Sequence, residues 1–97
     1  MPALPGLVRR VLAYTHELMV VHNTIQAGTV LPAHQHPHQQ IIYIQNGEVR
    51  LSCQGEEQVM RAGDSCAIPG DVAHSVVALT DSVVLDIFTP ARQDFIA

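Results

Sequence analysis

Three of the six histidines in this 97-residue chain lie close together, in an arrangement that suits a metal ion. They are His34, His36 and His38, and the same segment contains Pro32 and Pro37. Alternate side chains of an extended segment share a face, so imidazoles at this spacing can point the same way and bind one ion together. The cluster favours a metal site, but it leaves open a solvated, histidine-rich loop whose rings contact nothing.

Other kinds of catalytic chemistry lack the residues that they need. The chain contains no lysine, which removes Schiff bases, a lysine general base and the lysine of a P-loop. A G-x-S-x-G motif is also absent, and Ser65 and Ser75 lie in ordinary strand contexts, so a serine nucleophile is not supported. The arginines form no basic run and the net charge is −4, so we expect no nucleic-acid partner.

The elements that must position these residues are strands. Turn residues recur at the short spacing typical of an all-β sandwich or barrel, and helical periodicity is absent. We expect strands over residues 8–14, 18–25, 41–45, 48–53, 57–60, 65–68, 74–79 and 82–88. Asn46 and Gly47 predict a tight hairpin in which residues 48–53 pair back onto residues 41–45.

Length and composition predict one compact domain. Hydrophobic residues make up 47% of the chain and charged residues 14%, which is too apolar for a disordered protein. We expect a single domain over residues 1–97, with a core from about residue 8 to about residue 89 and a short irregular tail after Pro90. The apolar surface that so small a core leaves exposed predicts a homodimer.

The N-terminal residues indicate a cytoplasmic protein, and this location bears on the two cysteines. Arg9 and Arg10 follow a short apolar stretch interrupted by proline and glycine, which is the wrong order for a signal peptide and too short to span a bilayer. We therefore expect no membrane partner. Cys53 and Cys66 lack C-x-x-C spacing, and in a reducing compartment we expect buried thiols without a functional role.

The spacing of glycine, histidine and proline residues resembles that of the cupin superfamily. In the register of the two cupin motifs stand Gly28, His34, His36, Gln40 and Gly47, then Gly63, Pro69 and His74. The resemblance implies an all-β, single-domain cupin fold, which is a double-stranded β-helix or jelly-roll barrel. It also implies one divalent metal ion held by His34, His36, Gln40 and His74.

The chain departs from the common cupin pattern at a few positions. Asp71 stands where the second motif has glycine, which here falls at Gly70, and Ala78 replaces the usual asparagine. Gln40 replaces the glutamate of most cupins, so four neutral donors would leave the full charge on the ion and make it a stronger Lewis acid. Nitrogen and oxygen donors suit nickel, zinc, iron, manganese or cobalt, so the identity of the metal stays open.

Within the cupins, the chain is most similar to the small KdgF-like pectin-degradation cupins. The matching segments are residues 10–14, 34–40, 62–65 and 85–95, and generic cupins lack the last of these. That family also uses glutamine as its fourth ligand, in agreement with Gln40, but it often has glutamate where this chain has Gln39. The resemblance implies ketonisation of a 4,5-unsaturated monouronate from pectin or alginate, and hence a small anionic sugar acid as substrate.

Three further positions match catalytic residues of that family, namely Asp86, Phe88 and Arg92. Asp86 shares the parity of Val84 and Phe88 on the last strand, so if that face lines the barrel its carboxylate points toward the ion and can move a proton. Arg92 would hold the substrate carboxylate through two parallel hydrogen bonds. The structural alternatives are a strand-end cap or a loop-pairing residue for Asp86, core packing for Phe88 and a surface position for Arg92.

Several polar residues near these positions have no assigned role. His22 alternates with Val20, so it either lines the cavity or is a hydrogen-bonded core histidine. His38 ranks below the four ligands, as a donor to one of them or as a substrate contact. The role of Gln39 is open, and His16 lies in a turn that we expect to face solvent.

The resemblance favours a metal-dependent, isomerase-type enzyme that acts on a sugar-derived acid. A non-haem iron dioxygenase is an alternative, because a three-histidine barrel can also activate oxygen. The other alternative is a non-enzymatic cupin that binds a small ligand, since fold does not dictate function. Metal analysis and oxygen consumption separate the first alternative from the isomerase.

Overall fold

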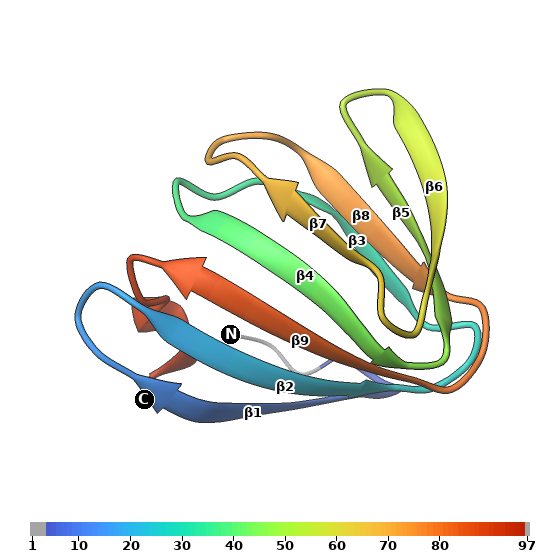
Figure 1. Ribbon diagram of the computed structural model, residues 1–97, viewed down its shortest axis with the longest axis horizontal. Coiled ribbons are helices and arrows are strands. Elements are labelled where there is room, and N and C mark those ends of the chain that lie inside the picture. Colours follow the sequence, from blue (N-terminus) through green and yellow to red (C-terminus); the bar gives the residue numbers. More distant parts are fainter. Residues whose placement is uncertain (1–3, 97) are drawn as a thin grey trace.

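The structure, a computed structural model, describes residues 4–96, which form two antiparallel β-sheets that face each other (Figure 1). The first sheet has the strand order β1-β2-β9-β4-β7, and the second has the order β3-β8-β5-β6. The elements are β1 (Leu7–Tyr14), β2 (Met19–Ile25), β3 (Val30–His34), β4 (Gln39–Asn46), β5 (Glu48–Cys53), β6 (Glu56–Arg61), β7 (Ser65–Ile68), β8 (His74–Ala78), β9 (Ser82–Thr89) and a 3-10 helix, η1 (Gln93–Phe95). No helix in this described part of the chain is long and apolar enough to cross a membrane.

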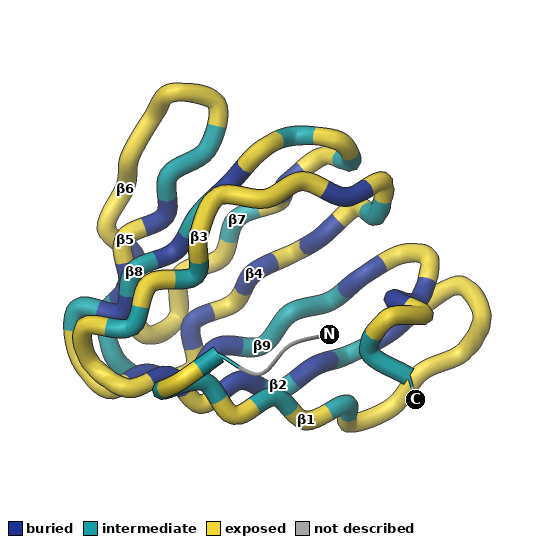
Figure 2. Tube along the Cα trace, turned by 180° about the vertical axis from the view of Figure 1, so that it is seen from behind, coloured by how far each residue is buried: buried dark blue, intermediate teal, exposed yellow. Residues whose placement is uncertain are grey.

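The core lies between the sheets because apolar residues alternate along the strands. In β4, Ile42 and Ile44 are buried, whereas Ile41 and Tyr43 are exposed. Figure 2 shows this alternation of buried and exposed positions along the strand. β-Branched residues of this kind fit a pleated surface that is buried on one side. The inward-facing side chains of both sheets therefore form one large packed cluster, and a second, smaller cluster lies around Met19 and Phe88.

The all-β prediction is confirmed, and each of the predicted strands occurs with its ends within two residues of the expected positions. Sequence patterning missed β3, which lies at an edge of its sheet. Most of its residues are exposed, so apolar alternation is absent, and it contains Pro32, which an edge strand tolerates. Residues 1–3 and 97, which the single-domain prediction includes, lie outside the described residues. Cys53 and Cys66 are free thiols, partly buried against the core.

The predicted hairpin between residues 41–45 and 48–53 is wrong. β4 pairs with β9 and β7, whereas β5 pairs with β6 and β8, so the chain passes from one sheet to the other at Gly47. A type I′ hairpin needs positive φ at both central residues. Here Gly47 has a φ of +88°, and Asn46 remains in the extended strand.

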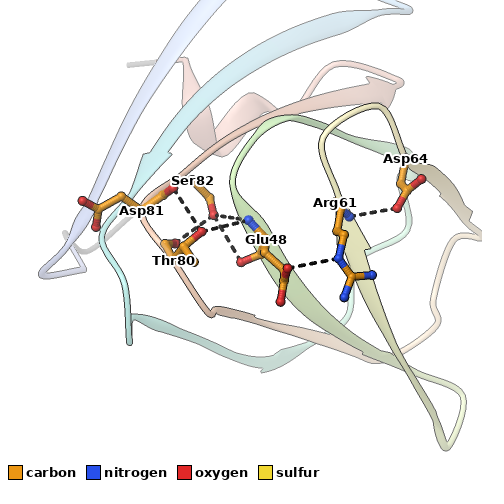
Figure 3. Close-up of polar contacts among 6 residues, drawn as sticks. All are labelled: Glu48, Arg61, Asp64, Thr80, Asp81 and Ser82. Atoms are coloured by element: carbon orange, nitrogen blue, oxygen red, sulfur yellow. Dashed lines mark hydrogen bonds and ion pairs between the residues drawn. The ribbon is translucent and has the colours of Figure 1, made fainter.

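Hydrogen bonds join the start of β5 to the start of β9 and to the turn before it, and they stabilise this crossing (Figure 3). The backbone N–H of Glu48 donates to Thr80 Oγ1 at 3.0 Å and to Ser82 Oγ at 3.2 Å. The single hydroxyl proton of Ser82 lies within reach of two carbonyl oxygens, that of Thr80 at 2.9 Å and that of Glu48 at 3.3 Å. A Cβ atom on Gly47 would lie against the backbone of Asp81 and Ser82, so the crossing leaves room for glycine only.

Gly47→Ala is therefore expected to lower the free energy of unfolding by about 2–4 kcal/mol, from strain at positive φ together with overpacking. Gly28→Ala is the matched control, because Gly28 has a φ of +85° and nothing lies within 4 Å of the added methyl group. Gly28→Ala is expected to lower the free energy of unfolding by about 1 kcal/mol, because it adds only the strain at positive φ. Urea denaturation measures both values. Equal losses would contradict the close approach of the two sheets at Gly47.

Candidate metal centre

Three histidine side chains converge between the two sheets. His34 ends β3 and His74 begins β8, and these residues are Cα partners on the two neighbouring strands. His36 lies in the loop that follows β3. The ring centroids are 4.4, 5.1 and 5.5 Å apart, and one nitrogen from each ring lies within 4.8 Å of the others. The imidazoles thus surround a common centre.

Each of the three rings is oriented by a backbone carbonyl oxygen two residues away. The acceptors of Nδ1 are Pro32 O for His34 (3.0 Å), His38 O for His36 (3.0 Å) and Val72 O for His74 (2.9 Å). A carbonyl oxygen can only accept, so this hydrogen-bond network assigns the ring proton to Nδ1. In the neutral form of each ring the lone pair is therefore on Nε2, which is the atom that would bind a metal.

Two of the three imidazoles, those of His36 and His74, are buried, and they fit a metal ion better than they fit a structural role. His74 is only 3% exposed, and its Nε2 is buried with no hydrogen-bond partner. An unsatisfied buried polar atom costs about 1–3 kcal/mol, which a bound cation would offset. Burial, followed by Arg92 and the neighbouring histidines, lowers the pKa of His36 to about 4. His36 is therefore neutral near pH 7, as metal ligation requires.

Gln40 brings a fourth neutral donor from the facing sheet. Its Oε1 lies 3.2 Å from His36 Nε2, and its Nε2 donates to Asp86 Oδ1 at 2.8 Å. Because His36 carries its proton on Nδ1, two lone pairs face each other across the 3.2 Å contact. Donor atoms about 2.1 Å from the same ion are about 3.0–3.4 Å apart. The contact therefore has the spacing of two ligands that share a cation.

Asp86 lies beside this group, and both of its carboxylate oxygens accept hydrogen bonds. Gln40 Nε2 donates to Oδ1, and Asn23 Nδ2 donates to Oδ2 at 2.9 Å. Burial raises the pKa of Asp86 to about 6, because the two amide hydrogen bonds and the arginines only partly offset the cost of burying a carboxylate. Asp86 can therefore hold or release a proton near neutral pH. It is not the strand-end cap considered from sequence.

Arg92 and Phe88 form the wall of the site next to η1. Arg92 is buried and donates to Asp94 through Nε (2.9 Å) and Nη2 (2.7 Å). Its guanidinium carbon lies 4.3 Å from the ring centroid of Phe95 and 5.1 Å from that of Phe88. The surface position considered for Arg92 is therefore wrong, whereas Phe88 is buried as its core interpretation expected.

A cavity of about 420 Å³ lies between the sheets beside the imidazoles. Among the residues that line it are His34, Gln40, His74, Asp86, Phe88 and Arg92. His36 packs edge-on against Phe88, with the ring centroids 5.7 Å apart. All seven residues singled out from the sequence as ligands or catalytic groups thus lie at this cavity or in contact with it.

Other polar residues near the cluster lie differently from expectation. His22 is on the outer face of β2, opposite to the inward-facing Val21 and Asn23, so its placement in the cavity or the core is wrong. His38 contributes its carbonyl oxygen, which accepts from His36, and its ring packs against Phe88. His38 therefore contacts a candidate ligand through its backbone acceptor, and not through its imidazole as a donor. Gln39 is exposed.

Sequence reasoning missed several residues of the cavity wall. Among them are Arg9, Asn23, Asp94 and Phe95. Asn23 could have been found, because it occupies an inward position between Val21 and Ile25, where apolar side chains are expected. Arg9 stacks on Phe95 at 4.1 Å from the ring centroid. Nothing in the spacing of Arg9 signals a contact with a residue at the other end of the chain.

Comparisons with known proteins extend over almost the whole chain. The Cupin domain family (Cupin_2) matches residues 21–88. Pectin degradation protein KdgF of Dickeya dadantii strain 3937 is 31% identical over 93 residues, which cover 94% of this chain and 84% of that protein. The family match includes the four neutral donors and two of the three predicted catalytic positions, Asp86 and Phe88, whereas Arg92 lies beyond it.

Solved structures agree with the sequence comparisons. KdgF from Halomonas sp. superposes with a TM-score of 0.94 at 36% identity, covering 99% of this chain and 91% of that chain. An RmlC-like cupin from Shewanella frigidimarina NCIMB 400 superposes with a TM-score of 0.91 at 38% identity, covering 94% of this chain and 82% of that chain.

Proposed function

The chain belongs to the cupin family and is a KdgF-like member of it, and from this premise we propose that it is a metal-dependent enzyme that ketonises an unsaturated uronate derived from pectin or alginate. The observation that carries the proposal is the position of Asp86. Its carboxylate is hydrogen-bonded to Gln40, whose other amide atom faces the imidazole cluster. A proton-transfer group and a candidate cation site thus share one cavity.

The donor set His34, His36, His74 and Gln40 would hold one divalent ion. When bound there, the ion supplies a Lewis acid that polarises a substrate oxygen and stabilises the negative charge that develops on it. Four neutral donors leave the ion its full charge, which strengthens this effect.

Asp86 would move the proton. Ketonisation of an enol removes a proton from oxygen and adds one to carbon, so the atoms balance without an oxidant or a reductant. A carboxyl group whose pKa is about 6 can accept the first proton and return it, because neither form is strongly disfavoured near neutral pH. The hydrogen bonds from Asn23 and Gln40 hold both carboxylate oxygens in place during the transfer.

Arg92 would bind the substrate carboxylate. Asp94 accepts hydrogen bonds from Nε and from one N–H of Nη2. The other N–H of Nη2 and those of Nη1 remain, and they can donate two parallel hydrogen bonds to a substrate carboxylate. Phe88 and Phe95 hold the guanidinium plane by stacking. Because the guanidinium is planar and already held in position, it loses little side-chain entropy when it binds a carboxylate.

The experiment that tests the proposal follows the ultraviolet absorbance of an unsaturated monouronate. The metal-loaded protein is expected to accelerate the loss of this absorbance, whereas protein treated with a chelator is expected to do so only after the ion is restored. No acceleration with uronates from either polysaccharide would overturn the proposal. Consumption of oxygen together with bound iron would point instead to the dioxygenase alternative.

Arg92→Lys is expected to raise KM for the uronate about ten- to a hundredfold, with a smaller change in kcat. Lysine keeps the charge but loses the two-point geometry, and charge-assisted hydrogen bonds contribute about 1.5–3 kcal/mol. Steady-state kinetics measure the changes in KM and in kcat separately. Arg10→Lys, on an exposed position of β1, is the control and should leave KM unchanged. A KM for Arg92→Lys within twofold of the parent would remove Arg92 from substrate binding.

A further inference from the structure

Asn23 is a polar residue on a buried strand face. It is 2% exposed and lies between the inward-facing Val21 and Ile25 on β2. Its Nδ2 donates to Asp86 Oδ2 at 2.9 Å and to the carbonyl oxygen of Val84 at 3.3 Å. Asn23 and Val84 are Cα partners, so Asp86 is its diagonal neighbour on β9.

The two contacts of Nδ2 define the orientation of this amide. Both neighbours, the carboxylate of Asp86 and the carbonyl of Val84, are acceptors, so the nitrogen and not the oxygen of Asn23 faces them. The Oδ1 atom then lies on the other side, buried and without a hydrogen-bond partner among the described residues. This unsatisfied acceptor costs free energy, so the contribution of Asn23 lies in the hydrogen bond that its Nδ2 donates to the carboxylate of Asp86.

The same reasoning defines the orientation of Gln40. Its Nε2 donates to Asp86 Oδ1, and a reversed amide would place Oε1 against the carboxylate. Oε1 must therefore face His36 Nε2, which is the side of the imidazole cluster. This matters because the amide oxygen has lone pairs for a cation, whereas the NH₂ group has only donors.

Asn23, Asp86 and Gln40 thus form a chain of hydrogen bonds that crosses three adjacent strands, β2, β9 and β4. Asn23 restrains the rotation of the Asp86 carboxylate by occupying Oδ2. With Oδ2 occupied, Oδ1 is directed at Gln40. We infer that Asn23 is a positioning residue that, through Asp86, presents the oxygen of Gln40 to the metal centre, an inference that rests on the proposed role of Gln40 as a ligand.

A double-mutant cycle tests this inference with Co²⁺ alone, so that inactivity on uronates does not affect the result. Asn23→Val, Gln40→Ala and the double variant are titrated with Co²⁺ against a chromophoric chelator. Asn23→Val is expected to weaken Co²⁺ binding about tenfold, as for other residues that orient a ligand, and to alter the visible absorption of the bound ion. In the Gln40→Ala background, Asn23→Val is expected to have no further effect.

The controls separate positioning from folding. Thr24→Val, at an exposed position of the same strand, should leave Co²⁺ affinity unchanged. Thermal unfolding of metal-free Asn23→Val should remain within a few degrees of the parent, because the substitution also removes the unsatisfied Oδ1. If Asn23→Val does not fold, Asn23→Ala takes its place in the cycle. Unchanged Co²⁺ affinity, or losses that add in the double variant, would overturn the inference.

Discussion

His74→Ala is expected to weaken binding of a divalent ion by about 10²- to 10³-fold. Zinc sites with a full set of ligands bind with about 10–16 kcal/mol, so one ligand in four contributes about 2.5–4 kcal/mol, and each 1.4 kcal/mol is a factor of ten. His74 is suited to this test because its Nε2 has no other hydrogen-bond partner. Competition with a chelator of known affinity measures the change.

The same variant separates metal binding from folding. An ion at a hundred times its Kd should stabilise the parent by about 2.7 kcal/mol and raise its Tm, but it should leave the Tm of His74→Ala almost unchanged. His16→Ala is the control, since His16 is exposed in the turn before β2. If His74→Ala binds the ion as tightly as the parent does, His74 is not a ligand and the three-histidine site is wrong.

Asp86→Asn is expected to reduce kcat for uronate ketonisation by about 10²- to 10⁴-fold, which is the usual contribution of a positioned acid–base group. Asparagine has nearly the same shape, but it cannot accept and return a proton. Its single side-chain oxygen can accept from Gln40 or from Asn23, so part of the hydrogen-bond chain survives. KM should therefore change far less than kcat, and initial rates over a range of uronate concentrations measure both constants.

The control for this variant is a surface carboxylate. Asp71→Asn suits the purpose because Asp71 is exposed and has a φ of +61°, a conformation that asparagine also tolerates. It should leave kcat unchanged. An Asp86→Asn variant with parental kcat would mean that another group moves the proton, although the metal site itself would be unaffected by that result.

The strands could be predicted from the sequence because β-branched residues and turn residues alternate clearly. β4 is an example, since its inward isoleucines alternate with exposed residues. The hairpin at Gly47 was predicted wrongly because a glycine after asparagine indicates only that the chain turns. Which strand it then pairs with depends on long-range contacts, here those of Glu48 with Thr80 and Ser82.

The candidate metal centre was only partly predictable from spacing, because His34 and His36 stand on alternate residues whereas Gln40 and His74 were expected only from the resemblance to the cupin motifs. The cavity wall was less predictable. Asn23 resembles any polar interruption of a strand until its contact with Asp86, from a distant part of the chain, is known. The burial of Arg92 likewise depends on its stacking against Phe88 and Phe95, which no local pattern indicates.

Every step of the proposed chemistry depends on whether four uncharged donors share one cation. Anomalous diffraction from crystals of the zinc-loaded protein measures this at atomic detail. We expect a single strong anomalous peak, which marks a zinc ion bound by Nε2 of His34, His36 and His74 and by Oε1 of Gln40. Imidazoles that turn away from one another into solvent, or a peak that lies elsewhere, would contradict the assignment of the metal centre and the mechanism built on it.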